Sequence, residues 1–200
     1  MFLTLLFFVT FLGRLIFSPL LPAIGEDIAL TSGQAGSIFF VGSFGLLAGS
    51  MVAGLLSSRL NHRRTILLSV FGIAAVLAVI FFVDSVWGLR GAMFVLAFFA
   101  GIHLPSSVAT ITATVREQDW PRALSVQQLG PPLGLIAAPL VAVGLSHWLS
   151  WQTIFVWVAG LALVLNLSFL FFHNLFQRCK FSFNILFICV CKELTYNRFF

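Results

Sequence analysis

The chain consists of long apolar runs separated by short polar stretches. A helix needs about 20 residues to cross a hydrocarbon core about 30 Å thick. Six runs are long enough, at residues 2–22, 33–57, 65–83, 89–114, 123–146 and 152–172. The pattern therefore predicts an all-α membrane protein in which residues 1–175 form a bundle of six transmembrane helices.

Two of these runs contain residues that indicate how their helices pack. Gly45 and Gly49 lie one turn apart in the second run, so they leave a smooth surface that another helix can approach closely. The fifth run contains Gly130, Pro131 and Gly134. Because proline has no N–H to donate, we expect this fifth helix to be kinked.

Composition excludes a soluble domain and narrows the choice of partners. Hydrophobic residues make up 60% of the chain and charged residues 8%, which leaves too few polar groups to cover a globule in water. The basic residues behind the net charge of +5 form no continuous stripe, as nucleic-acid binding would require. We therefore expect a lipid bilayer around the chain and no nucleic-acid partner.

The arginines predict the orientation of the bundle. Loops rich in Lys and Arg stay on the cytoplasmic side of a membrane. With six spans, the loops on one side carry no Lys or Arg, and the loops on the other side carry Arg59, Arg63, Arg64, Arg116 and Arg122. We expect a multi-pass protein of the cell membrane with both ends of the six-helix bundle in the cytoplasm.

The loop at residues 54–64 also resembles a signature of the major facilitator superfamily, in which basic residues join the second and third helices. The matching positions are Gly54, Arg59, Arg63 and Arg64. Ser58 and Asn61 depart from the pattern, where the family has an acid and a second Gly. The resemblance covers residues 2–172 and implies half of a major-facilitator fold, built of two inverted three-helix repeats. It also implies that the loop gates the cytoplasmic side and that a carboxy-terminal six-helix half is a partner.

Polar residues within the predicted spans are the candidates for substrate binding. A charge near the centre of a spanning helix costs about 2.5 to 3.5 kcal/mol on insertion scales, so Arg14 should have a compensating partner. Four-residue spacing places it on one stripe of the first helix, made of Thr10, Arg14 and Ser18. The fourth helix carries a similar stripe, made of His103, Ser107 and Thr110.

The resemblance implies that the first and fourth helices face one central cavity, so both stripes are expected to contact substrate. Gln128, near the cytoplasmic end of the fifth helix, is a further candidate. Together with Gln127 it can instead serve as a hydrogen-bonding contact between helices. His103 is the candidate carrier of a coupling proton, since imidazole exchanges protons near neutrality.

The predicted spans contain no Asp or Glu, so Arg14 has no internal counter-ion. Its partner could be water, a backbone carbonyl freed by Pro19 or Pro22, a carboxylate from a missing half, or an anionic substrate that neutralises it. The last of these predicts a secondary active transporter, or its amino-terminal half, for a small anion such as nitrate, nitrite or a small carboxylate. The alternative is a truncated membrane fragment that does not transport. No nucleophile–base pair, metal-ligand cluster or phosphate-binding Gly loop is present, so we expect no enzyme, cofactor or metal site.

The sequence changes character near residue 176. All three cysteines follow this point, and residues 176–200 contain no Gly or Ala. The apolar run at residues 181–191 is too short to span a membrane. We interpret residues 176–200 as an atypical tail from a shifted reading frame or a truncated gene. The alternative is a genuine half-size transporter with a short interfacial segment.

Overall fold

The computed structural model describes residues 2–59 and 62–171. Within these residues, six helices are long and apolar enough to cross a membrane: Leu3–Ile28, Ser32–Leu56, Arg64–Phe82, Val86–Thr114, Glu117–Ser146 and Trp151–Phe171. The all-α prediction with six transmembrane helices is therefore confirmed. The tail predicted at residues 176–200 lies outside the described residues.

The first span is two helices, α1 (Phe2–Leu15) and α2 (Phe17–Ile28), separated by a turn at Ile16. Pro19 has no N–H to give to the carbonyl four residues earlier, which explains an interruption at this point. The span was predicted to end at residue 22, but it continues to Ile28, which is about 1.7 more turns. Pro22 is accommodated inside α2, which ends where Ala29 adopts a left-handed conformation with φ 52°.

The next three spans begin with local capping or a short turn. α3 (Ser32–Arg59) is preceded by a reciprocal pair in which Gln34 N–H donates to Thr31 Oγ1 and Thr31 N–H donates to Gln34 Oε1. α4 (His62–Val79) continues into the 3-10 helix η1 (Ile80–Phe82). α5 (Val86–Thr114) is capped by the Ser85 hydroxyl, which accepts a hydrogen bond from Gly88 N–H at 3.1 Å.

The fifth span is also interrupted, as predicted from its prolines. It consists of η2 (Glu117–Asp119), α6 (Trp120–Gln127) and α7 (Gly130–Ser146). Pro131 and Pro132 follow the break and have no N–H for the carbonyls one turn earlier. The sixth span then runs from Trp151 to Phe171.

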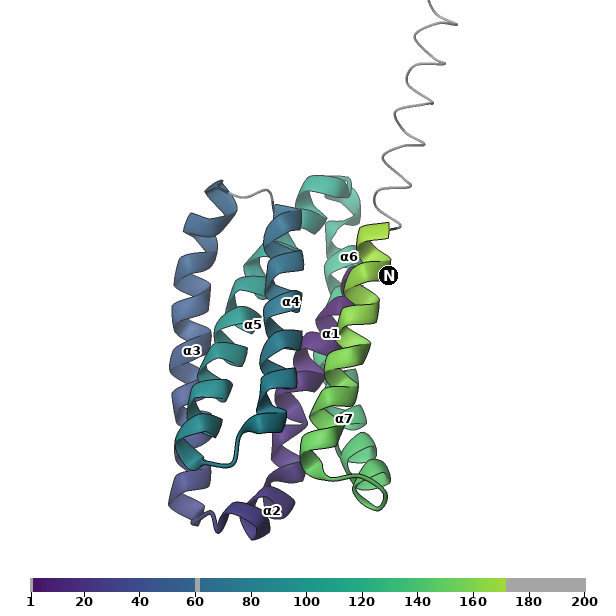
Figure 1. Cartoon of the computed structure of the whole chain (residues 1–200). Helices are drawn as coiled ribbons and strands as arrows, with labels where there is room; N and C mark the ends of the chain where they lie inside the picture. Colours follow the sequence, from purple (N-terminus) through teal and green to yellow (C-terminus); the bar gives the residue numbers. More distant parts are fainter. Residues whose placement is uncertain (1, 60–61, 172–200) are drawn as a thin grey trace, which may run out of the picture. The chain divides into compact units, whose positions relative to one another are not determined.

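Glycines allow the second and fourth spans to pack closely. An added Cβ at Gly45 would collide with the Phe94 carbonyl, and one at Gly49 with the Phe98 carbonyl. The close-packing surface predicted on the second span is thus confirmed, and its partner is α5. Figure 1 shows α4 on the other side of α5, which it contacts, while α1 packs against α7.

The contacts between the spans bury an apolar core, and the remaining apolar residues are exposed. The core includes Phe17, Leu77, Met93, Leu96 and Phe155. One face of α3, in contrast, exposes the large apolar side chains of Phe40, Phe44, Leu47, Met51 and Leu55. An exposed apolar helix face is what a lipid environment permits, in agreement with the composition.

Candidate functional site

His103 is completely buried, and its ring is held by groups from two other spans. Its Nδ1 lies 3.1 Å from Ser69 Oγ on α4. The Ser69 hydroxyl donates its single proton to the Ile66 carbonyl at 2.7 Å, so we infer that Nδ1 carries the proton and donates to Ser69. Phe7 of α1 stacks on the imidazole with ring centroids 5.8 Å apart. His103 thus joins α1, α4 and α5.

The tautomer inferred for His103 leaves Nε2 as a bare hydrogen-bond acceptor. Among the described residues, this atom is buried and has no hydrogen-bond partner. A buried polar atom without a partner costs about 1–3 kcal/mol, so such an atom calls for an explanation beyond packing. It can take up a proton or accept a hydrogen bond from a donor that reaches it.

The fourth-span stripe is connected to the fifth span by Gln127. The Gln127 side chain is buried, and its Nε2 donates to Ser107 Oγ at 2.6 Å. The Ser107 hydroxyl donates in turn to the Leu104 carbonyl at 2.8 Å. Gln128, the residue expected to contact substrate, is exposed, and Gln127 is the one that contacts the stripe.

The threonines of the two stripes use their hydroxyl protons within their own helices. Thr10 Oγ1 donates to the Leu6 carbonyl, and Thr110 Oγ1 donates to the Ser106 carbonyl, each at 2.8 Å. Both side chains are buried. With Ser107 bonded in the same way, these hydroxyls keep acceptor lone pairs but have no free proton to offer an anion.

Arg14 and Ser18 differ from the other residues of the two stripes because they retain free donors. Arg14 is half-buried, and its guanidinium forms no ion pair or hydrogen bond with any residue that the structure describes. Ser18 is exposed, and its hydroxyl likewise has no hydrogen bond within residues 2–59 and 62–171. Along the first-span stripe, the buried Thr10 hydroxyl already donates to its own helix, whereas Arg14 and Ser18 have donors that are available to a ligand.

The acidic residues near the spans do not compensate Arg14. The expectation of acid-free spans needs a correction, because Glu26 and Asp27 lie in the last turns of α2 and the fifth span begins with Glu117 and Asp119 in η2. All four are exposed, and Glu26 and Asp27 follow Arg14 by 12 and 13 residues. Asp27 Oδ2 instead accepts a hydrogen bond from Trp151 Nε1 at 3.0 Å.

The predicted gating loop is described in part. α3 includes Gly54 and ends at Arg59, and α4 includes Arg63 and Arg64. Arg64 is exposed, whereas the side chains of Arg59 and Arg63 lie outside the described part of the chain.

The Gly-Pro segment packs the fifth span against the first. Gly130 is buried, and an added Cβ would lie 3.0 Å from Phe7 Cδ1 and 3.1 Å from Phe8 N. Gly134 faces α1 one turn later, with the nearest α1 atoms 3.5 Å from an added Cβ. Pro131, between them, is partly buried. This contact holds Phe7 where it stacks on His103.

Sequence reasoning did not identify Ser69 or Phe7 as neighbours of His103. Neither stands out in its own span, since Ser69 is one serine in an apolar run and Phe7 is one of 24 phenylalanines in the chain. Each meets His103 only through packing between helices. An intramembrane histidine nevertheless indicates that a polar partner must exist on a neighbouring helix.

Comparison with known proteins identifies the family. Residues 3–178 match the Major Facilitator Superfamily. A relative, the 3-(3-hydroxy-phenyl)propionate transporter of Escherichia coli (strain K12), is 33% identical over 144 residues, which cover 68% of this chain and 34% of the relative. The match thus spans about a third of the relative's length. With six candidate spans, the protein is a multi-pass integral membrane protein. The chain belongs to the major facilitator superfamily, a family of membrane transporters and not of enzymes.

Proposed function

We propose that the chain forms the amino-terminal half of a secondary active transporter for a small organic carboxylate, and that Arg14 supplies the positive charge. The observation that carries this proposal is a guanidinium inside the first span that has no partner among the described residues. An unpaired charge in a membrane is energetically costly. A ligand that neutralises this charge therefore binds with a favourable free energy. An anion does so, and the Ser18 hydroxyl can donate a second hydrogen bond.

We favour a carboxylate over nitrate or nitrite at this site. A guanidinium can bind any of these anions through two parallel N–H···O contacts, so the choice rests on the comparison with a relative. The relative from Escherichia coli is named for a substituted propionate, which is a carboxylate and not an inorganic anion. Between the anions expected from the sequence, we therefore favour a carboxylate that carries an organic group.

We assign the coupling proton of this half to His103. Its Nε2 is a buried acceptor without a partner in the described residues. Because Nδ1–H is bonded to Ser69, a proton arriving at His103 binds at Nε2. Ser107, Thr110 and Thr10 then support the packing around this group, and Gln128 is left for contacts outside the bundle.

The orientation and partners expected from the sequence belong to the same proposal. We place the bundle in the cell membrane with both of its ends in the cytoplasm, as the arginine-rich loops indicate. The loop residues Gly54, Arg59, Arg63 and Arg64 gate this cytoplasmic side. A carboxy-terminal half of six helices completes the cavity, since family members bind substrate between two halves.

The first test compares Arg14→Gln with Arg122→Gln, which removes the same charge from an exposed position on α6. Binding of labelled 3-phenylpropionate, propionate and nitrate is measured on the purified chain, alone and with a carboxy-terminal half. We expect Arg14→Gln to reduce carboxylate binding at least about tenfold, equivalent to about 1.4 kcal/mol. We expect Arg122→Gln to bind as the wild type does.

The fold should survive in Arg14→Gln, because the change removes an unpaired charge from the span. Undiminished binding by Arg14→Gln contradicts the proposal. Binding by the wild type only together with the second half shows that these residues form half of a site. Absence of binding in both settings favours the alternative of a non-transporting fragment.

A further inference from the structure

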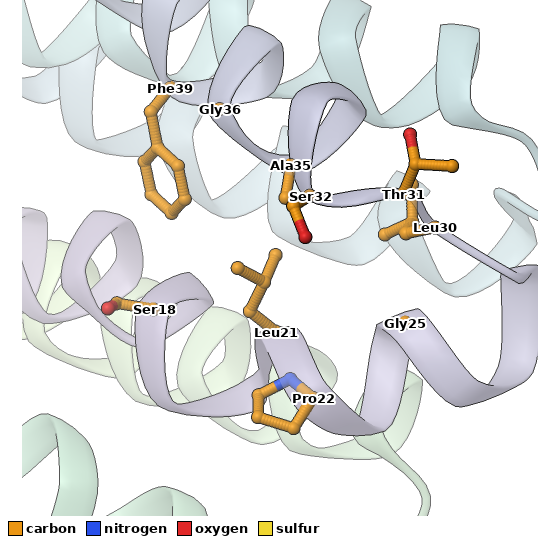
Figure 2. A pocket seen from close by; sticks show the side chains of 10 residues that line it. All are labelled: Ser18, Leu21, Pro22, Gly25, Leu30, Thr31, Ser32, Ala35, Gly36 and Phe39. Carbon is orange, nitrogen blue, oxygen red and sulfur yellow. The ribbon is translucent and has the colours of Figure 1, made fainter.

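A pocket of about 550 Å³ lies between α2 and the beginning of α3. Figure 2 shows Leu21 pointing into this space from α2 and Phe39 pointing into it from α3. Ser18 lies on the α2 wall, and Ala35 and Gly36 lie on the α3 wall. The volume falls within the range of about 300–1,000 Å³ that is usual for small-molecule sites.

The lining of the pocket combines apolar walls with a few hydroxyl groups. Leu21, Pro22 and Phe39 provide carbon surface, and Ser18 and Ser32 provide hydroxyls that have no hydrogen bond in the described residues. Ligand pockets usually have this composition, with many apolar groups and a few polar groups that set the orientation. The aromatic ring of Phe39 can pack against another ring in an edge or offset geometry.

Ser18 connects the pocket to Arg14 along the first span. It lines the pocket and follows Arg14 by four residues, about 6 Å of helix rise, across the turn at Ile16 that joins α1 to α2. A ligand whose charged end meets Arg14 and Ser18 therefore extends its other end along α2 toward Leu21 and Phe39. The pocket is where that other end is accommodated.

Small residues on α3 keep this space open. An added Cβ at Gly36 would meet no atom within 4 Å. A larger side chain at this position would therefore enter the pocket without collision in the core. Gly33 also has no atom within 4 Å of an added Cβ, but it does not line the pocket, so it provides a matched control on the same helix.

We propose that this pocket binds the ring of an aryl-substituted carboxylate whose carboxylate end is held by Arg14 and Ser18. This inference rests on the carboxylate carrier proposed above and adds a specificity site to it. Gly36 determines how large the apolar group can be, and Leu21 and Phe39 provide its contacts. Carboxylates that lack a ring leave the pocket unfilled and gain nothing from it.

The experiment compares 3-phenylpropionate with propionate, which differ only by the ring. Equilibrium binding of each labelled acid is measured on the full chain and on Gly36→Leu, Gly33→Leu and Arg14→Gln, in whichever setting the wild type binds propionate. We expect Gly36→Leu to weaken the binding of 3-phenylpropionate at least about tenfold, because the Leu side chain occupies the space of the ring. Propionate should bind this variant within about twofold of the wild type, and Gly33→Leu should bind both acids normally.

The outcomes separate this inference from the proposed function. Unchanged binding of 3-phenylpropionate by Gly36→Leu overturns the pocket assignment and leaves the carboxylate site in place. An equal loss in Gly33→Leu also overturns it, because the effect would not depend on the pocket. Undiminished binding of both acids by Arg14→Gln overturns the carboxylate site, and the pocket assignment with it. If Gly36→Leu does not fold, Gly36→Ala is used instead, because it adds one methyl group to the same wall. This variant should weaken the binding of 3-phenylpropionate and leave the binding of propionate unchanged. Wild-type binding of both acids by Gly36→Ala overturns the inference.

Discussion

Several buried polar side chains of this bundle are held by a specific partner on a neighbouring helix. The Ser69 hydroxyl donates a hydrogen bond to the Ile66 carbonyl and accepts a hydrogen bond from His103, so it acts as both donor and acceptor. Phe7 covers the imidazole, and Gly130 makes room for Phe7. The buried histidine is therefore positioned by contacts from two other spans, and the fifth span supports one of these contacts through Gly130 and Phe7.

The contact between Ser69 and His103 predicts an effect on stability. In Ser69→Ala the imidazole Nδ1–H loses its acceptor while remaining buried, which should cost about 1–3 kcal/mol. Ser50→Ala is the matched control, because Ser50 is exposed and donates only to the Leu46 carbonyl of its own helix. Thermal unfolding in detergent should show a midpoint temperature clearly below that of the wild type for Ser69→Ala. The midpoint temperature of Ser50→Ala should be almost unchanged. Equal midpoints for both variants would contradict the inferred contact.

The sequence indicates which residues are candidates for function, but it does not indicate which residues contact each other. Arg14 and His103 stand out because charged and titratable groups are rare in spanning helices. The sequence does not distinguish Gln127 from Gln128, since neighbouring residues point about 100° apart and the direction of each depends on where α6 ends. The structure buries Gln127 against Ser107 and exposes Gln128. Chain-distant contacts of this kind need packing information that one sequence does not hold.

At the scale of whole helices, glycine spacing determines which spans lie closest. Gly45 and Gly49 of α3 meet the Phe94 and Phe98 carbonyls of α5, and Gly101 of α5 meets the Leu46 carbonyl of α3. Such close approach increases van der Waals contact and brings Cα–H groups near carbonyl oxygens. The pair of helices is therefore fixed by small residues on both partners.

The close contact between α3 and α5 predicts opposite effects of alanine at two glycines of the same helix. Gly49→Ala should destabilise the bundle by about 1–3 kcal/mol, because its methyl group collides with the Phe98 carbonyl. Gly54→Ala should be neutral or stabilising by up to about 1 kcal/mol, because an added Cβ there meets no atom within 4 Å and alanine favours helix. Unfolding in detergent measures both. A destabilised Gly54→Ala beside an unchanged Gly49→Ala would contradict the observed packing.

The number and order of the helices follow from the hydrophobic pattern, whereas some boundaries do not. Proline marks weak points in the first and fifth spans, but it does not say whether a span ends there. α2 continues through Pro22, while the fifth span breaks before Pro131. The difference depends on whether neighbouring groups tolerate the missing hydrogen bond, which is a property of the bundle and not of the local sequence.

At the scale of the whole molecule, charge and apolar surface together suit a membrane with a defined orientation. The exposed side chains along α3 are apolar, including Phe40, Met51 and Leu55. Arg64, in contrast, lies at the start of the third span, and Trp148 lies exposed in the turn before the sixth. Because basic loops are retained in the cytoplasm, the end of the bundle that carries Arg64 should be inside and the turn that carries Trp148 outside.

This orientation can be tested with two introduced cysteines. His62 begins α4 beside Arg64, and Trp148 is 86% exposed in a turn, so His62→Cys and Trp148→Cys should report opposite faces of the membrane. Cys179, Cys189 and Cys191 are first replaced by serine, so that each variant carries one thiol. In intact cells an impermeant thiol reagent should label Trp148→Cys and spare His62→Cys, which should react only after the membrane is opened. The six-helix topology places three spans between these two positions, so they must lie on opposite sides of the membrane. Labelling of both variants from outside would therefore contradict this topology. Protection of Trp148→Cys together with labelling of His62→Cys would retain the spans and reverse the orientation, placing the arginine-rich loops outside against the charge rule.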